Sequence, residues 1–228
     1  MIKLVVFDLD GTLVTAEINF LAMRHAIRDL FLNQGFPVEV LPMNSTQDLL
    51  RSAFVYAQDQ GMPIIELSRL RDKAYEVAMR EEWKGARKAQ LVPGTIETLS
   101  ELERRHVDVA VLTNDNFRCT EFLISKFGLQ RYIGLVISRD QTPHMKPATD
   151  GLEIILQHFR VTPAEAIFVG DSTIDVLTAI KLGMKCIGRI SKVRTAEELL
   201  AEGAIAVIPS LTELIPYLDA KHLLPPPL

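Results

Sequence analysis

Short apolar runs recur along the chain, and each is followed by a turn or polar stretch and then by a helical pattern. They occupy residues 4–7, 107–112, 135–137, 166–169, 185–187 and 205–208. Apolar runs of this length, rich in β-branched residues, are typical of buried strands. Strands that alternate with helices are typical of a parallel sheet with helices on both faces. The pattern therefore predicts an α/β fold.

Three polar sites in the second half carry the signature of a helix start. Thr162, Thr195 and Ser210 are each followed three residues later by a glutamate. In this arrangement the hydroxyl and the glutamate satisfy each other's backbone N–H groups at the first turn. Pro163 strengthens the first of these signals, because proline is favoured at the first helical position. The sequence thus predicts helices that begin at these three points.

Residues 15–90 have a different pattern. Apolar positions there recur every three or four residues, as at Leu67, Leu70, Ala74, Val77 and Ala78. This period predicts amphipathic helices, and no convincing strand interrupts them. We therefore expect an α/β core domain formed by residues 1–14 and 91–228, with an all-helical cap domain, residues 15–90, inserted into it. Trp83 is interpreted as part of the core of that insertion.

Charge and cysteine content narrow the class of protein. The chain has 228 residues, with 25 Lys and Arg against 29 Asp and Glu, so its net charge is −4. No overall positive charge is present to attract nucleic acid, which is therefore not an expected partner. Cys119 and Cys186 lack the CxxC spacing and lie among apolar neighbours, which predicts buried thiols. The apolar run at the N-terminus is too short for a signal peptide or a membrane span, so we expect a cytoplasmic protein without a membrane partner.

Two pairs of acidic residues follow predicted strands. Asp8 and Asp10 come directly after the first apolar run, and Asp171 and Asp175 follow the fourth. Ligand sites in open parallel sheets lie at the carboxyl ends of strands. The spacing of four is expected to place Asp171 and Asp175 on one face of a first helical turn. If the two strand ends converge, four carboxylates share one pocket.

Four carboxylates in one pocket either have raised pKa values or bind a cation. Oxygen ligands of this kind suit Mg²⁺, whereas zinc is disfavoured because these segments contain no His or Cys. A divalent ion together with Lys146 would reduce the four negative charges to about −1, which leaves room for a phosphate group. The residues therefore predict Mg²⁺ as a cofactor.

Further polar residues lie where they could reach the same pocket. Thr113 and Asn114 follow the run 107–112, and Lys146 lies in the loop after the run 135–137. A hydroxyl and an amide can hold phosphate oxygens, and a lysine can offset charge during phosphoryl transfer. The combination indicates chemistry on a phosphate ester.

These residues, taken in chain order, resemble the four motifs of the haloacid dehalogenase-like hydrolase superfamily. The resemblance spans residues 4–175 and rests on Asp8-Leu9-Asp10-Gly11-Thr12, Thr113-Asn114, Lys146-Pro147, and Gly170-Asp171 with Asp175. The helical insertion after the first motif resembles the small cap of the branch that contains phosphoglycolate phosphatase and β-phosphoglucomutase. The resemblance implies a Rossmann-like core in which the first strand lies between the strands that bear Thr113 and Asp171.

The resemblance also implies a role for each residue. Asp8 would be the nucleophile that forms an aspartyl-phosphate, and Asp10 would protonate the leaving oxygen and then deprotonate the attacking water. Mg²⁺ would be held by Asp8, the backbone carbonyl of Asp10 and Asp171, with Asp175 acting directly or through a water. Thr113 and Asn114 would bind the phosphoryl group, and Lys146 would steady its charge.

Three functions remain open at this point. In the superfamily that the sequence resembles, the members that displace halide lack this second acid. The presence of Asp10 therefore favours phosphoryl transfer over dehalogenation. The expected activity is a Mg²⁺-dependent phosphatase that acts on a small phosphorylated metabolite. A phosphomutase or other phosphotransferase would use the same residues, and a non-catalytic binding module on this scaffold is the third alternative.

Two positions depart from the family pattern. Asp115 adds a negative charge beside the expected phosphate site, and we expect it to point outward at the start of a helix that begins near Phe117. His144 lies in the loop before Lys146, where relatives carry a glycine-rich stretch, and we interpret it as a solvated side chain.

Overall fold

The computed structural model describes residues 1–16, 18–192 and 194–226. The chain forms two compact units. We call Met1–Ala16 with Ala89–Leu228 the core unit, and Glu17–Lys88 the helical unit. Among the described residues no helix has both the length and the apolar character needed to cross a bilayer.

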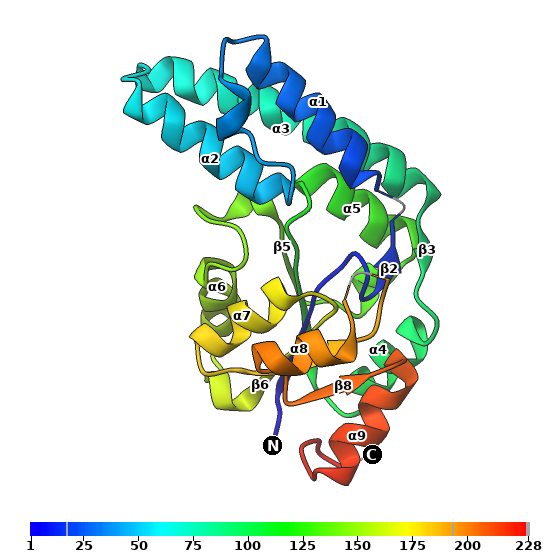
Figure 1. The fold of residues 1–228 in the computed structure, drawn as a ribbon. Coiled ribbons are helices and arrows are strands. Elements are labelled where there is room, and N and C mark those ends of the chain that lie inside the picture. The colour runs from blue at the N-terminus through cyan, green and yellow to red at the C-terminus, as the bar shows by residue number, and fades with distance from the viewer. Residues whose placement is uncertain (17, 193, 227–228) are drawn as a thin grey trace. The chain divides into compact units, whose positions relative to one another are not determined.

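A parallel six-stranded sheet forms the centre of the core unit (Figure 1). In spatial order its strands are β5 (Leu135–Ile137), β4 (Asp108–Leu112), β1 (Leu4–Phe7), β6 (Ala166–Gly170), β7 (Lys185–Arg189) and β8 (Ala206–Ile208). All six apolar runs thus form strands, and the α/β prediction is confirmed. The expected position of β1, between the strands that precede Thr113 and Asp171, is also confirmed.

The register of β1 aligns the strand ends at which the candidate residues lie. Phe7 is paired with Val111 on one side and with Val169 on the other. All four residues of β1 are fully buried, as expected for a central strand that is covered on both faces. Because the strands are parallel, the residues that follow them emerge at one edge of the sheet.

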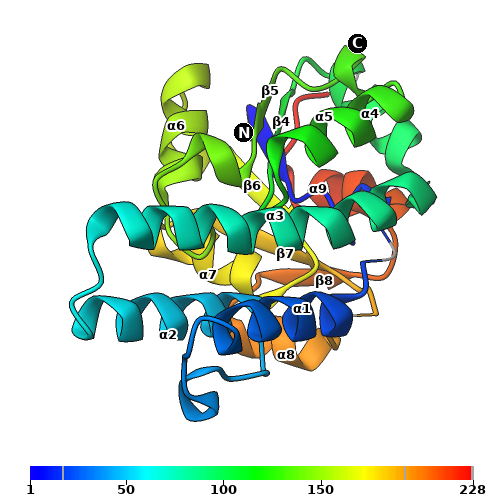
Figure 2. The same cartoon turned by 90° about the horizontal axis from the view of Figure 1, so that it is seen from above.

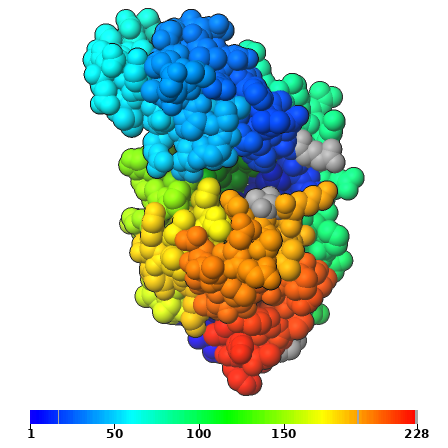
Figure 3. All heavy atoms as spheres, in the orientation of Figure 1, coloured from blue at the N-terminus to red at the C-terminus, as the bar shows by residue number. Residues whose placement is uncertain are grey.

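Helices cover both faces of this sheet (Figures 1 and 2). One face carries α6 (Asp150–Phe159), α7 (Thr173–Lys181) and α8 (Ala196–Glu202), and the other carries α4 (Thr95–Arg104) and α5 (Phe117–Lys126), with α9 (Leu214–Ala220) packed against α4. Leu4 and Val6 pack under the first set, against residues such as Leu152, Val176 and Leu199. Figure 3 shows α7 and α8 side by side on the surface of this unit.

The three predicted helix starts have different outcomes. Thr195 forms a capping box with Glu198 and begins α8, as predicted. Ser210 precedes the short 3-10 turn Leu211–Glu213, which continues into α9. The helix start predicted at Thr162 is also present, with its capping box and Pro163, but it opens only the 3-10 turn Pro163–Glu165, because β6 begins at the next residue. Two further 3-10 turns, Leu129–Arg131 and Arg139–Gln141, flank β5.

The helical unit consists of three α-helices and one 3-10 turn within the described residues. These are α1 (Phe20–Leu32), the turn Val38–Val40, α2 (Thr46–Asp59) and α3 (Ile64–Lys88), which Figure 2 shows from above. Their core includes Phe31, whose ring centroid lies 5.1 Å from that of Phe36 and 5.8 Å from that of Phe54. Trp83 is 40% exposed, so its assignment to this core is wrong. It lies off the stripe of α3 that buries Ala74 and Ala78.

A short two-stranded ladder lies where the core unit is interrupted by the helical unit. β2 (Val14–Thr15) pairs antiparallel with β3 (Gln90–Leu91). The backbone N–H of Val92 extends the ladder by donating to the carbonyl of Leu13 at 3.0 Å. The chain therefore leaves and re-enters the core unit at neighbouring positions.

Candidate active site

Three carboxylates converge at the carboxyl ends of β1 and β6. Each of Asp8, Asp171 and Asp175 offers an oxygen that lies within 4.8 Å of the other two. All three residues are buried. Asp8 is fixed at its backbone, because its N–H donates to the carbonyl of Val169 at 2.9 Å. The sheet thus brings together residues that are more than 160 positions apart in the sequence.

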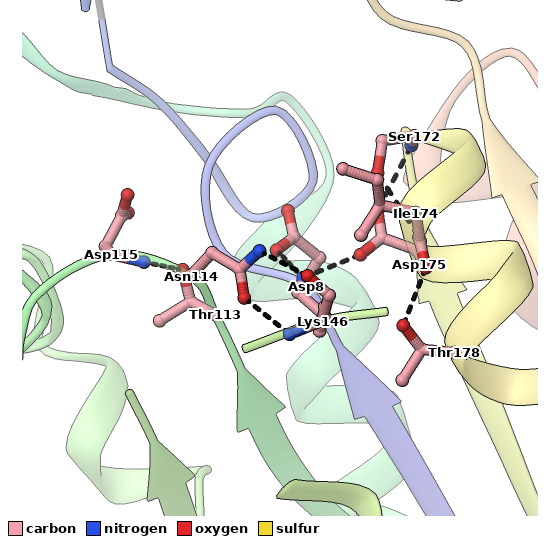
Figure 4. A network of polar contacts seen from close by, with 9 residues as sticks. All are labelled: Asp8, Thr113, Asn114, Asp115, Lys146, Ser172, Ile174, Asp175 and Thr178. Atoms are coloured by element: carbon pink, nitrogen blue, oxygen red, sulfur yellow. Dashed lines mark hydrogen bonds and ion pairs between the residues drawn. The ribbon is translucent and has the colours of Figure 1, made fainter. Parts of the chain in front are cut away.

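Lys146 joins this group from the loop after β5 (Figure 4). Its Nζ lies 2.6 Å from Oδ1 of Asp8 and 2.6 Å from Oδ1 of Asp175. It also lies 5.5 Å from the centroid of the Phe168 ring. One buried ammonium therefore bridges two of three buried carboxylates, so the cluster has an excess of negative charge when all three acids are ionised.

The pKa values of these groups reflect burial and mutual repulsion. Burial raises the pKa of Asp8 well above its usual value, and the charges of Asp175 and Asp171 add to this effect while Lys146 opposes it. Burial, and then the charge of Asp175, raises the pKa of Asp171 to about 6. Burial alone would lower the pKa of Lys146, but the charges of Asp175 and Asp8 outweigh it and raise that pKa above its usual value.

The donor set fits a magnesium ion. Oδ2 of Asp171 is buried and has no hydrogen-bond partner among the described residues. A buried carboxylate oxygen without a partner is costly unless a cation binds it. The cluster offers only carboxylate oxygens, without His or Cys, which is the chemistry that a hard divalent cation prefers.

Two glycines allow the carboxylates to approach the backbone so closely. Gly11 has φ +87°, and a Cβ at this position would lie 2.1 Å from Oδ2 of Asp171. A Cβ on Gly170 would lie 2.5 Å from Cβ of Asp175. Both distances are shorter than any normal contact, so each position requires glycine.

Asp175 is held by the first turn of α7. It accepts hydrogen bonds at Oδ2 from the hydroxyl of Ser172 at 2.6 Å and from the Ser172 backbone at 3.1 Å, while its Oδ1 contacts Lys146. Asp171 precedes this helix, which begins at Thr173. The two acids are therefore close, but not because they share a helical face as the spacing of four suggested.

Asp10 has a separate environment. Its Oδ1 accepts a hydrogen bond from the backbone of Ala16 at 2.6 Å. Burial raises the pKa of Asp10 to about 8, and the charges of Asp115 and Asp171 add to the effect. A carboxyl group with this pKa is protonated at neutral pH and can act as an acid.

Thr113 and Asn114 lie at the end of β4, next to this cluster (Figure 4). The Thr113 hydroxyl accepts a hydrogen bond from the backbone of Asp115 at 3.1 Å and retains its own proton for donation. Both polar atoms of the Asn114 amide contact the backbone of Lys146, through Oδ1 at 2.9 Å and Nδ2 at 3.1 Å. The amide that was expected to bind a phosphoryl group is thus engaged within the chain.

Asp115 and His144 are the two positions that depart from the family pattern. Asn116, not Asp115, caps α5, since its side chain accepts from the backbone of Cys119. Figure 4 shows the Asp115 carboxylate turned away from Asp8, although its charge still affects the pKa of Asp10. His144 is exposed, and its Nδ1 lies 3.1 Å from Oδ1 of Asp150.

Arg189 and Ser191 are neighbours of this site that were not predicted from the sequence. Arg189 ends β7 and donates a hydrogen bond to the carbonyl of Gly11. Its positive charge and a hydrogen bond from Ser191 both lower the pKa of Asp171. Their place in the sequence could have identified them, because both residues follow the predicted strand 185–187 at the edge of the sheet where Asp8 and Asp171 lie.

Comparisons with known proteins find haloacid dehalogenase-like hydrolases and phosphatases. A family model described as haloacid dehalogenase-like hydrolase matches residues 5–189. A phosphoglycolate phosphatase of Pseudomonas savastanoi pv. phaseolicola is 31% identical, over 98% of this chain and 83% of its own length. A probable phosphatase of Dickeya dadantii is 28% identical, over 94% of this chain and 93% of its own. A putative haloacid dehalogenase-like hydrolase from Bacteroides fragilis has the same fold, with a TM-score of 0.71, 20% identity, and coverage of 94% of this chain and all of its own.

Proposed function

The chain belongs to the haloacid dehalogenase-like hydrolases and is a phosphoric monoester hydrolase, and we propose that it transfers the phosphoryl group of a small phosphorylated metabolite to water through Asp8, with Mg²⁺ as cofactor. One observation carries this proposal: the buried Lys146 contacts Asp8 beside the unpartnered Oδ2 of Asp171. The arrangement provides a nucleophile, a neutralising charge and an oxygen for a cation.

The first half-reaction forms a bond between a carboxylate oxygen of Asp8 and phosphorus, while the bond from phosphorus to the leaving oxygen breaks. A carboxylate is a poor nucleophile towards an anionic phosphate unless positive charge offsets their repulsion. Lys146, 2.6 Å from Asp8, supplies part of that charge. In this proposal the hydroxyl of Thr113 donates a hydrogen bond to a phosphoryl oxygen.

Asp10 moves the protons of both half-reactions. With its pKa raised to about 8, it is protonated at neutral pH and donates its proton to the leaving oxygen. The resulting carboxylate then removes a proton from water as the water attacks phosphorus and the bond to Asp8 breaks. Inorganic phosphate leaves, and Asp10 is protonated again.

The residues that would hold Mg²⁺ are Asp8, Asp171 and the backbone carbonyl of Asp10, with Asp175 acting directly or through a water. When bound, the ion supplies positive charge that offsets the charge of the phosphoryl group. Asp175 also contacts Lys146 at 2.6 Å, so the chain couples the metal site to the lysine.

We assign residues 1–14 and 91–228 to the catalytic core and the helical insertion 15–90 to a cap that excludes water and selects the leaving group. Because several relatives are named phosphoglycolate phosphatase, 2-phosphoglycolate is the first substrate to test. We propose a cytoplasmic protein without nucleic-acid or membrane partners, on the grounds of its acidic charge and reduced, buried cysteines.

The test is the release of inorganic phosphate from a panel of phosphate monoesters that includes 2-phosphoglycolate and hexose phosphates. Wild type and Asp8→Asn are compared with Mg²⁺ and with EDTA. We expect metal-dependent release that is lost in the variant. Conversion of a hexose phosphate to its isomer without release would establish a mutase instead. A folded wild type that binds Mg²⁺ but turns over no ester would overturn the proposal.

A further inference from the structure

Asn114 contacts Lys146 through a pair of reciprocal hydrogen bonds. Its Oδ1 accepts from the backbone N–H of Lys146 at 2.9 Å, and its Nδ2 donates to the backbone carbonyl of Lys146 at 3.1 Å. Figure 4 shows the amide directed at this backbone. Both ends of the amide are therefore directed at one residue, 32 positions away in the sequence.

The position of the Lys146 backbone matters because its side chain has little freedom. The ammonium lies 2.6 Å from Asp8 and from Asp175, and the residue is 5% exposed. A shift of the backbone would move the ammonium out of at least one of these contacts. Displacements of about 1 Å at a reacting centre can cost on the order of 10²-fold in rate.

Lys146 has no strand to fix it, because it follows β5 at a distance of several loop residues. The loop is instead attached to the end of β4. The Arg139 guanidinium donates to the Asn114 carbonyl at 3.2 Å, and the Arg139 backbone donates to the Asp115 carbonyl at 3.0 Å. Asp140 accepts from the backbone of Phe117 at 2.7 Å. Asn114 extends this attachment to Lys146 itself.

We propose that Asn114 is a positioning residue that holds Lys146 in place, rather than a side-chain ligand of the phosphoryl group. This inference rests on the proposed function and refines one part of it. The amide of Asn114 acts on the reaction only through Lys146. Removing the amide of Asn114 is therefore expected to slow the reaction only while the lysine ammonium is present.

A double-mutant cycle with Asn114→Ala and Lys146→Ala tests this dependence. In the wild-type background we expect Asn114→Ala to lower kcat by about 10-fold to 100-fold, because Lys146 loses its backbone support. In the Lys146→Ala background the same change is expected to alter kcat by less than about 3-fold, since residues that act as a unit are not additive. An equal loss in both backgrounds would overturn the proposal.

The thermal stability of the same four proteins separates this role from a general effect on folding. The hydrogen bonds of Asn114 go to the backbone of Lys146, which Lys146→Ala retains. The drop in melting temperature caused by Asn114→Ala is therefore expected to be similar in both backgrounds, although its effect on kcat is not.

Binding of inorganic phosphate, measured by calorimetry, gives a readout that needs no turnover. If the Asn114 side chain bound the phosphoryl group directly, Asn114→Ala would weaken phosphate binding by about 10-fold even in the Lys146→Ala background, and the inference would be wrong. We expect a change of less than about 3-fold there.

Asn116→Ala is the matched control. Asn116 lies two residues further along and caps α5 by accepting from the backbone of Cys119 at 3.0 Å. This variant is expected to lower the melting temperature but to leave kcat within about 2-fold of wild type. A wild type without phosphatase activity would contradict the proposed function, whereas an active wild type with additive losses would contradict only the role of Asn114.

Discussion

Asp8 and Asp10 are two positions apart, but their surroundings differ. Asp8 is in contact with Lys146, whereas Asp10 accepts hydrogen bonds from the backbone of Ala16 and Gly11 and is repelled by Asp115 and Asp171. Burial raises the pKa of both acids, but at Asp8 the charge of Lys146 opposes this effect and favours the ionised form, whereas the charges near Asp10 add to it. Two carboxyl groups in different environments can thus serve as nucleophile and acid.

The pKa of about 8 at Asp10 predicts the alkaline side of the pH profile. Because Asp10 must be protonated to act as an acid, kcat/KM is expected to fall about 10-fold per pH unit above pH 8. Asp115→Asn removes one of the charges that raise this pKa, so the fall should begin at lower pH. The measurement is kcat/KM against pH at saturating Mg²⁺. Identical profiles for the two proteins would show that Asp10 is not the acid.

Gly11 lies so close to Asp171 that a side chain at this position would displace it. In Gly11→Ala the new Cβ would lie 2.1 Å from Oδ2 of Asp171, so Asp171 must move. Gly128→Ala is the control, because Gly128 also has positive φ (+67°) but nothing within 4 Å of a Cβ. Gly128→Ala should lose about 1 kcal/mol of stability because of its positive φ, and Gly11→Ala should lose more because the clash adds to the same penalty. Only Gly11→Ala should raise the Mg²⁺ concentration needed for half-maximal turnover, by about 10-fold or more, in a metal titration. An equal rise in both variants would rule out the steric argument.

Every residue of the carboxylate cluster, and Lys146, could be predicted from the sequence, because these residues follow predicted strands in a recognisable order. The contacts of Arg189 with the Gly11 carbonyl and of Asn114 with the Lys146 backbone could not be predicted. Both contacts join segments that lie far apart in the chain. Their geometry depends on strand order and register, which leave no local pattern.

At the scale of elements, α7 and α8 both begin with a capping box, but only the box of α7 lies beside the site. Ser172 and Asp175 form a capping box at α7, beside Lys146, and Thr195 and Glu198 form one at α8 on the surface. The first box therefore orients a residue of the site in addition to starting a helix. The second only starts a helix.

Ser172→Ala and Thr195→Ala form a matched pair. Each removes the hydroxyl of a capping box and should cost about 1 kcal/mol of stability, measured by denaturant unfolding. Ser172→Ala also frees Oδ2 of Asp175 from a 2.6 Å hydrogen bond, so we expect kcat to fall about 10-fold. Thr195→Ala should leave kcat unchanged. A similar kcat for both variants would show that Ser172 has no role beyond capping.

The strands were predicted more accurately than the boundaries of the helices. β1 and β5 have the predicted ends, because each is a buried apolar run bounded by polar residues. The ladder of β2 and β3 was not predicted, since each strand has two residues and its partner is about 75 positions away. The capping signal at Thr162 was real, but local sequence does not show that a strand begins too soon for a helix to form.

At the scale of the whole molecule, the buried acids link stability to pH and metal. The folded-state pKa values of Asp10 and Asp171, about 8 and about 6, lie above the ordinary value of 3.8. The folded state therefore binds more protons than the unfolded state between these values. Stability from this source is fully present below about pH 4 and is lost as the pH rises from there to the folded-state pKa values, about 6 for Asp171 and about 8 for Asp10.

This linkage predicts the behaviour of the metal-free protein. In EDTA the melting temperature should fall between pH 5 and pH 8, because over this range Asp171 and Asp10 hold protons in the folded state that the unfolded state has already released. Mg²⁺ binds the ionised form, so it should raise the melting temperature more at pH 8 than at pH 5. Differential scanning calorimetry at both pH values checks this, with Asp171→Asn as the variant in which the Mg²⁺ effect is reduced. An equal effect of Mg²⁺ at both pH values would contradict the assignment.

The central position of β1 also has a consequence for synthesis of the chain. β1 is made before its partners β4 and β6, which begin more than 100 residues later, at Asp108 and Ala166. At about 5–20 residues per second, the ribosome needs on the order of 10 s to supply them. The three helices of the helical unit emerge earlier and contact one another, so they can fold while the apolar strand Leu4–Phe7 still waits unpaired. The nascent chain thus exposes an apolar segment to which a chaperone can bind until the strand that ends beside Asp171 has been translated.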